Sequence, residues 1–212
     1  MRILFNSPLL NCQLSTVNCQ HFGYAQCKLS TLPMSSSTLL VPANIKFDEA
    51  IALTQAFLNQ LKKKELTSSQ IQKFVSELVQ TSNGARGFFV TYLTAQDPIC
   101  DEPQPEIIAA LHAHPEIAAD LLVKNIAMST AQQLYHQRRN DLEMVASSAT
   151  VAARTTEIIQ QLKLPQIQDM CRELVDTIHN GSGSYSEFLT RWGYDDDQKN
   201  SIAQIVSSLG IY

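Results

Sequence analysis

The segment from Pro115 to about Arg138 limits the possible folds more than any other part of the sequence. Its apolar side chains recur with the period of a helix, about 100° per residue, and they occupy two opposite sides of that helix. The two sets are Ile117, Leu121, Met128 and Tyr135 on one side, and Leu122, Val123, Ile126 and Leu134 on the other. Because a helix that is apolar all round is buried inside a protein, we expect this one at the centre of the fold.

The following segment, residues 141–162, is predicted to form the second arm of a helical hairpin. One side carries small residues and the opposite side carries larger apolar ones: Ala146, Ala149 and Ala153 against Met144, Val151, Ile158 and Leu162. Small residues let two helix axes approach closely. Since only Asn140 and Asp141 connect the arms, the two helices should be antiparallel and form the spine of the protein.

Helix signals also fill the chain on both sides of this hairpin. Capping boxes, N-terminal prolines and C-terminal glycines mark where helices begin and end. Before the hairpin, they predict helices over residues 47–64, from Thr67 to a C-cap at Asn83-Gly84, over 87–93 and over 105–111. After the hairpin, they predict a helix over 165–180, a short helix that begins with a capping box of Ser184 and Glu187, and a last helix that runs from a capping box of Asp195 and Gln198 to Gly210. The expected fold is therefore all-α, a multi-helix bundle of about eight helices around a long central antiparallel helical hairpin.

The first 33 residues differ from the rest of the chain. All 20 acidic residues lie at or after Asp48, whereas residues 1–33 contain only two charged side chains. The tripeptide at 11–13 recurs at 18–20, a period too short for a repeat that stacks into a solenoid. Three functional alternatives fit these residues less well. A secretory signal needs an uninterrupted apolar run, a lipid anchor at Cys12 needs a small residue before it, and a zinc site needs cysteines closer together. We interpret residues 1–33 as a disordered or spurious N-terminal extension and 34–212 as a single all-α domain.

Composition disfavours two classes of partner. The formal net charge is -4, so the chain as a whole is not attracted to nucleic acid. Nucleic-acid binding is therefore unlikely unless Lys62–Lys64, Arg138, Arg139 and Arg154 share one face. No apolar run approaches the roughly 20 residues that cross a bilayer, so no membrane partner is expected. Cys100 and Cys171 are expected to be packed thiols in the reducing cytoplasm.

His112 and His114 are the candidate metal ligands. Glu116 and Asp120 follow them closely in the sequence. Residues two apart on a helix point in different directions, so both rings reach one ion only where Pro115 breaks the helix. In the alternative interpretation, His114 caps the next helix and His112 is exposed. No cofactor is predicted.

Four further residues are candidate ligand-binding groups. Lys124 lies on the apolar side of the central helix, one turn after Asp120, and it either marks a binding site or forms an i,i+4 ion pair along the surface. Arg86 stands close to two glycines that allow a ligand or the backbone to come near. His136 belongs to the polar C-terminal turn of the central helix, which could contact an acidic partner.

Two strings, Asn83-Gly84-Ala85-Arg86-Gly87-Phe88-Phe89 and Trp192-Gly193-Tyr194-Asp195-Asp196, resemble sequences of short, uncharacterised, all-helical cyanobacterial proteins. The resemblance implies a helical fold and brings no activity or ligand with it. No catalytic constellation is apparent, and broad apolar helix faces favour a non-catalytic soluble helical module acting through protein–protein contacts, with a protein partner or by self-association. The alternative is a small-ligand- or metal-binding helical protein, an enzyme included, with a pocket near His112, His114, Lys124 and Arg86.

Overall fold

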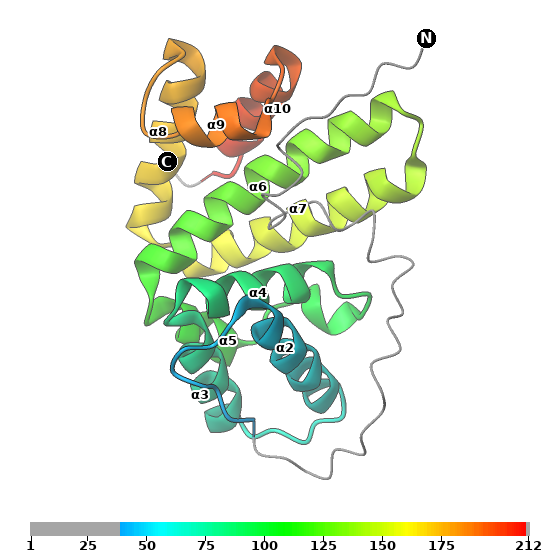
Figure 1. The fold of residues 1–212 in the computed structure, drawn as a ribbon, viewed down its shortest axis with the longest axis vertical. Helices are drawn as coiled ribbons and strands as arrows, with labels where there is room; N and C mark the ends of the chain where they lie inside the picture. Colours follow the sequence, from blue (N-terminus) through cyan, green and yellow to red (C-terminus); the bar gives the residue numbers. More distant parts are fainter. Residues whose placement is uncertain (1–38, 211–212) are drawn as a thin grey trace.

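The computed structural model describes residues 39–210, and within this range every regular element of secondary structure is a helix (Figure 1). The all-α prediction is confirmed. The elements are α2 (Phe47–Lys62), α3 (Ser68–Val79), α4 (Ser82–Thr94), the short 3-10 helix η2 (Pro98–Cys100), α5 (Pro105–His112), α6 (Pro115–Arg138), α7 (Leu142–Leu162), α8 (Pro165–Asn180), α9 (Ser186–Trp192) and α10 (Asp196–Ser207). None of the helices described is both long and apolar enough to cross a membrane.

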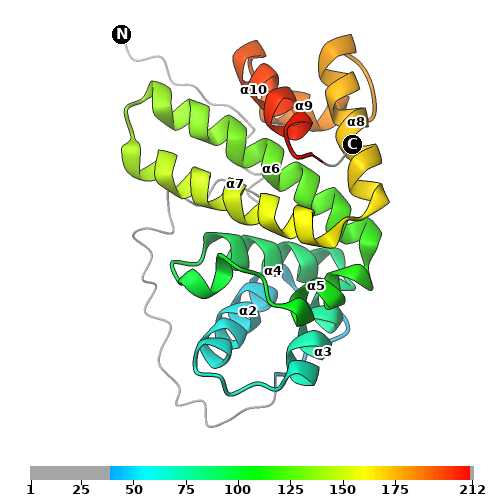
Figure 2. The same cartoon turned by 180° about the vertical axis from the view of Figure 1, so that it is seen from behind.

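The hairpin of α6 and α7 lies in the middle of the molecule, as predicted. Helices α2–α5 pack on one side of it and α8–α10 on the other, an arrangement visible from both directions (Figures 1 and 2). Asn140 makes the turn with a φ of 54°, a left-handed conformation that asparagine tolerates well. The Asp141 side chain then accepts a hydrogen bond from the Met144 N–H at 3.2 Å and caps α7. A short polar turn thus reverses the chain between the two longest helices.

The side of α7 that faces the core differs from the prediction. Ala146 and Ala153 are exposed and Ala149 is half-buried, so the alanine stripe does not form the contact between the arms. The buried side includes Ser148 and Thr155 instead. The Thr155 hydroxyl donates to the Val151 carbonyl at 2.7 Å, and this satisfied hydroxyl lets a small polar residue occupy a core position at low cost.

Two predicted helix boundaries are wrong. Residues Asn83 and Gly84 belong to the first turn of α4, not to the end of α3, because the Thr81 side chain accepts from the Gly84 N–H at 3.1 Å and caps α4. A Cβ at Gly84 would overlap the Leu78 carbonyl oxygen, so this glycine permits close packing. Similarly, α9 has no capping box from Ser184. It begins at Ser186, whose hydroxyl accepts from the Gly183 N–H at 2.8 Å.

Helices α2 and α4 pack at close range through Gly87. A Cβ at Gly87 would overlap the Cβ of Ala50 and lie 3.1 Å from the Ala50 carbonyl carbon. Ala50 is fully buried. This contact fixes the position of α4 against α2 and thereby the direction in which the other side of α4 points.

Arg154 of α7 ties the hairpin to the end of α4. Its guanidinium is buried and donates to the carbonyls of Leu93 at 3.0 Å and Ala95 at 2.6 Å, and its Nε donates to Asp101 at 2.8 Å. The basic face that nucleic-acid binding would require therefore lacks Arg154. Arg138 is ion-paired with Asp195 and Asp197.

Candidate ligand-binding groove

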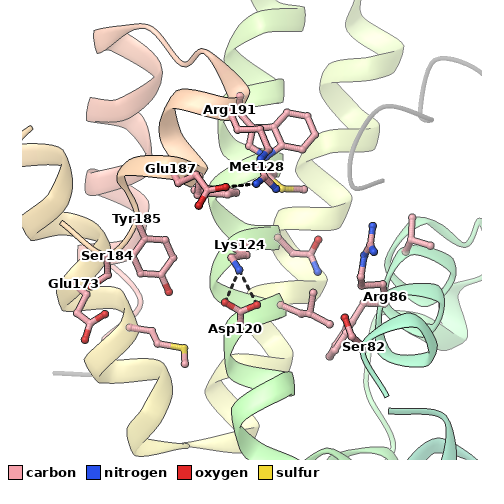
Figure 3. Close-up of a pocket in the computed structure, with 17 residues that line it drawn as sticks. Ser82, Arg86, Asp120, Lys124, Met128, Glu173, Ser184, Tyr185, Glu187 and Arg191 are labelled. Atoms are coloured by element: carbon pink, nitrogen blue, oxygen red, sulfur yellow. Dashed lines mark hydrogen bonds and ion pairs between the residues drawn. The ribbon is translucent and has the colours of Figure 1, made fainter. Parts of the chain in front are cut away.

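A groove of about 690 Å³ opens along one side of α6, between α4 and the pair α8 and α9 (Figure 3). Its floor and walls come from segments far apart in the sequence. The lining consists of Asp120, Leu121, Lys124, Asn125 and Met128 of α6, Ser82, Arg86, Phe89 and Val90 of α4, Met170 and Glu173 of α8, Ser184 and Tyr185 of the segment that follows α8, and Glu187, Phe188, Arg191 and Trp192 of α9.

The floor of the groove belongs to the side of α6 on which the sequence places Leu121 and Met128. Met128 is buried, whereas Leu121 and Lys124 are half-buried and Tyr135 further along the same side is 38% exposed. On the opposite side, Leu122 and Ile126 are fully buried. The expectation that α6 is buried all round is thus wrong at Leu121 and Lys124, where the groove leaves the helix partly open.

Two ion pairs inside the groove are each formed within one helix. The Lys124 Nζ lies 2.6 Å from the nearer carboxylate oxygen of Asp120, one turn earlier in α6. Arg191 pairs with Glu187 within α9. Both pairs appear as dashed lines in Figure 3. The predicted i,i+4 pair of Lys124 is present, and its residues also line the groove, so the two interpretations of Lys124 are compatible.

Arg86 and Glu173 form no ion pair within residues 39–210. The Arg86 guanidinium lies 5.4 Å from the centre of the Phe47 ring, a cation–π contact. Glu173 is exposed on α8. Figure 3 shows the two residues on opposite sides of the Lys124–Asp120 pair. One uncompensated cation and one uncompensated anion therefore border the same groove.

Tyr185 contributes a hydroxyl beside the carboxylates. Burial raises the pKa of Tyr185, and the nearby Asp120 and Glu173 carboxylates raise it further. The hydroxyl consequently stays protonated near neutral pH, so it is available as a hydrogen-bond donor at the wall of the groove.

The structure brings together three of the predicted ligand-binding residues, Arg86, Asp120 and Lys124. His136 lies elsewhere, at the far end of α6. Sequence reasoning missed the C-terminal wall with Glu173, because these residues approach α6 only through tertiary packing. A signal was nevertheless present, since both strings quoted for the resemblance contribute to the lining: Arg86 and Phe89 from the first, and Trp192 from the second.

The two candidate metal ligands are separate from the groove. His112 is exposed in the last turn of α5. His114 precedes α6 without capping it through its side chain, and a ring nitrogen lies 3.2 Å from the Ser76 hydroxyl. Within the part of the chain that the structure describes, no three His, Cys, Asp or Glu side chains are placed to share a metal ion.

His136 is a buried imidazole beside the α6–α7 turn. Its exposed fraction is 3%, and its Nδ1 makes no hydrogen bond among the described residues, lying 3.9 Å from an Asp141 carboxylate oxygen. Burial lowers the pKa of His136, whereas Asp141 acts in the opposite direction. The folded protein thus holds this ring in its neutral form.

Protonation of His136 should make stability pH-dependent. Because its folded-state pKa lies below the unfolded value of about 6.5, the unfolded chain binds the proton more readily, and the free energy of unfolding should fall as the pH drops below about 6.5. His136→Gln should flatten this decline, measured by urea unfolding at several pH values. His179→Gln, at an exposed position on α8, is the control. An equally steep decline in His136→Gln would contradict the assignment.

The fold and the groove define an all-α protein with a charged, apolar-floored groove on its central hairpin. The chain belongs to the family described as Uncharacterised conserved protein UCP020893, whose model matches residues 46–209. This range contains all of the described residues that line the groove. No curated protein and no solved structure matches the chain.

Proposed function

We propose that this chain is a non-catalytic helical binding protein that makes its protein–protein contacts through the groove on α6. The observation that carries the proposal is the partly open side of α6, where the half-buried Leu121 joins Phe188 and Trp192 of α9 in an apolar surface between charged side chains. Grooves with apolar floors and polar rims accept segments of other proteins. The same arrangement could serve a second copy of the chain that donates an exposed segment.

The scarcity of exposed apolar side chains elsewhere favours the groove over a flat patch. Among residues 39–210, the large apolar side chains that are exposed are Leu40, Tyr135 and Leu142. Single exposed apolar residues are ordinary in monomeric proteins. A protein partner would thus find its apolar contact area in the groove.

The composition of the groove supports binding over catalysis. Among the described residues that line it, there is no histidine and no cysteine. Ser82 and Ser184 are exposed, and a serine hydroxyl needs an adjacent base to act as a nucleophile. The buried free thiols Cys100 and Cys171 fit a reducing compartment, and we place the protein in the cytoplasm.

A second candidate function is the binding of a small organic ligand at the same place. Arg86, Asp120 and Lys124 converge on one concave volume of about 690 Å³, within the range of about 300–1,000 Å³ that drug-sized ligands occupy. Metal binding through His112 and His114 stays a separate prediction, which metal analysis of the purified full chain would test.

Filling the groove tests the proposed function. Asn125 lines the floor, so Asn125→Trp should occupy space that a ligand needs, whereas Ala153→Trp places the same side chain on the exposed side of α7. Peptide and small-molecule libraries would be screened by thermal shift, because a ligand that binds only the folded state raises its apparent stability. Hits should be lost in Asn125→Trp and kept in Ala153→Trp, with both variants first shown to be folded. Hits that persist in Asn125→Trp would place the binding site elsewhere.

A further inference from the structure

We propose that the occupant of the groove is a peptide segment with an acidic residue facing α4, a basic residue facing α8 and apolar residues between them. This inference rests on the proposed function and adds the chemistry of the partner. It follows from the charges left uncompensated in the groove and from the apolar side chains that the groove leaves half-buried.

The distribution of ion pairs assigns the charges of the partner. Lys124 and Arg191 each have a carboxylate partner on their own helix. Arg86 and Glu173 have none in residues 39–210, and they stand on opposite sides of the Lys124–Asp120 pair (Figure 3). A partner that covers them removes water from both, so it binds best when it supplies the opposite charge at each position.

The setting of Arg86 suits a carboxylate. One face of its guanidinium rests against the Phe47 ring, with 5.4 Å between the guanidinium carbon and the ring centre. This contact restricts the side chain, while the N–H donors at its edge stay available. A planar, restricted guanidinium can form two parallel hydrogen bonds to one carboxylate, an arrangement that a lysine ammonium cannot match.

The apolar side chains that the groove leaves partly buried come from three helices. Leu121 belongs to α6, Met170 to α8, and Phe188 and Trp192 to α9. An amphipathic helix can lay a row of apolar side chains against such a surface. A peptide supplies both charge signs together with repeated apolar groups, which favours it over a small molecule with a single charge.

Four designed peptides test the proposal with the full-length chain. Each peptide has capped ends, a fluorescein label and the same row of leucines along one side of a helix. The two positions that flank this row carry Glu and Lys in the first peptide, Glu and Gln in the second, Gln and Lys in the third, and Gln at both in the fourth. Measured by fluorescence anisotropy at low ionic strength, the peptide with both charges should bind most tightly. Each charge should tighten binding about five- to tenfold.

Variants of the two uncompensated residues assign each effect to its partner. Arg86→Gln should abolish the advantage given by the peptide Glu and leave that given by Lys, and Glu173→Gln should do the reverse. Arg86→Lys, which keeps the charge, should give an intermediate result and replaces Arg86→Gln if that variant does not fold. Arg139→Gln and Glu143→Gln are the matched controls, because both positions are exposed and neither lines the groove. Both variants should behave like the parent.

Four outcomes would overturn the inference, and they are distinguishable from failure of the proposed function. Equal binding of the four peptides, or a Glu advantage that survives in Arg86→Gln, shows that these residues do not select the partner. Binding of small molecules but of no peptide, with the hits lost in Asn125→Trp, keeps the groove as the site and refutes the peptide. Charge-dependent peptide binding that Asn125→Trp does not weaken refutes the groove itself.

Discussion

Replacing Arg154 with methionine should lower the free energy of unfolding by about 3–5 kcal/mol. The guanidinium is 5% exposed, and it donates to the carbonyl oxygens of Leu93, Ala95 and Asp97 at 3.0, 2.6 and 3.3 Å. These carbonyls lie at and just beyond the end of α4, where a helix has no backbone donors left to satisfy them. Methionine keeps much of the apolar stem but leaves the buried oxygens without partners.

Urea unfolding followed by circular dichroism measures this loss. Asp101 also pairs with Arg154, at 2.7 Å, but its side chain is 57% exposed, so water can replace that contact. Asp101→Asn should therefore cost about 1 kcal/mol or less and serves as the control. If the free energy of unfolding of Arg154→Met lies within about 1 kcal/mol of that of the parent protein, the carbonyls do not depend on this side chain for their hydrogen bonds.

Replacing Gly87 with alanine should lower the free energy of unfolding by about 1–3 kcal/mol. Helix propensity alone predicts the opposite sign, since alanine favours a helix interior over glycine by about 1 kcal/mol. The added Cβ would overlap the Ala50 Cβ and lie 3.1 Å from the Ile51 nitrogen. Because Ala50 is fully buried between the two helices, α2 and α4 must move apart, and the packing loss outweighs the gain in propensity.

A double-mutant cycle separates these two effects. Ala50→Gly removes the overlapping Cβ, so the double variant should be more stable than the sum of the single changes predicts, with a coupling of about 1 kcal/mol or more. Thermal and urea unfolding of the four proteins supply the cycle. A stabilised Gly87→Ala, or purely additive effects, would show that the two helices do not approach each other at Gly87.

The helical hairpin could be predicted from sequence because its signals are local. The apolar sides of α6 and the polar turn at Asn140 and Asp141 fix two long antiparallel helices without reference to the rest of the chain. The side of α7 that faces the core could not be predicted in this way. Small residues occur on both sides of that helix, and which set packs inward depends on the helices that cover it.

The candidate site was predictable in part for the same reason. Asp120 and Lys124 are one turn apart on a single helix, so their ion pair follows from spacing. Arg86 was identified from its neighbouring glycines, but nothing local places it beside Lys124. Glu173 and Tyr185 join the groove through the packing of α8 and the segment after it against α6. Sequence periodicity carries no information about such contacts.

The amino-acid sequence alone therefore determined the helices, most of their caps and the central hairpin, because these depend on side chains within a few residues of one another. Tertiary structure decided which part of α6 stays partly open, since that depends on where the flanking helix groups come to rest. It also left Arg86 and Glu173 facing one groove without partners, because charges from separate helices meet only after the chain has packed.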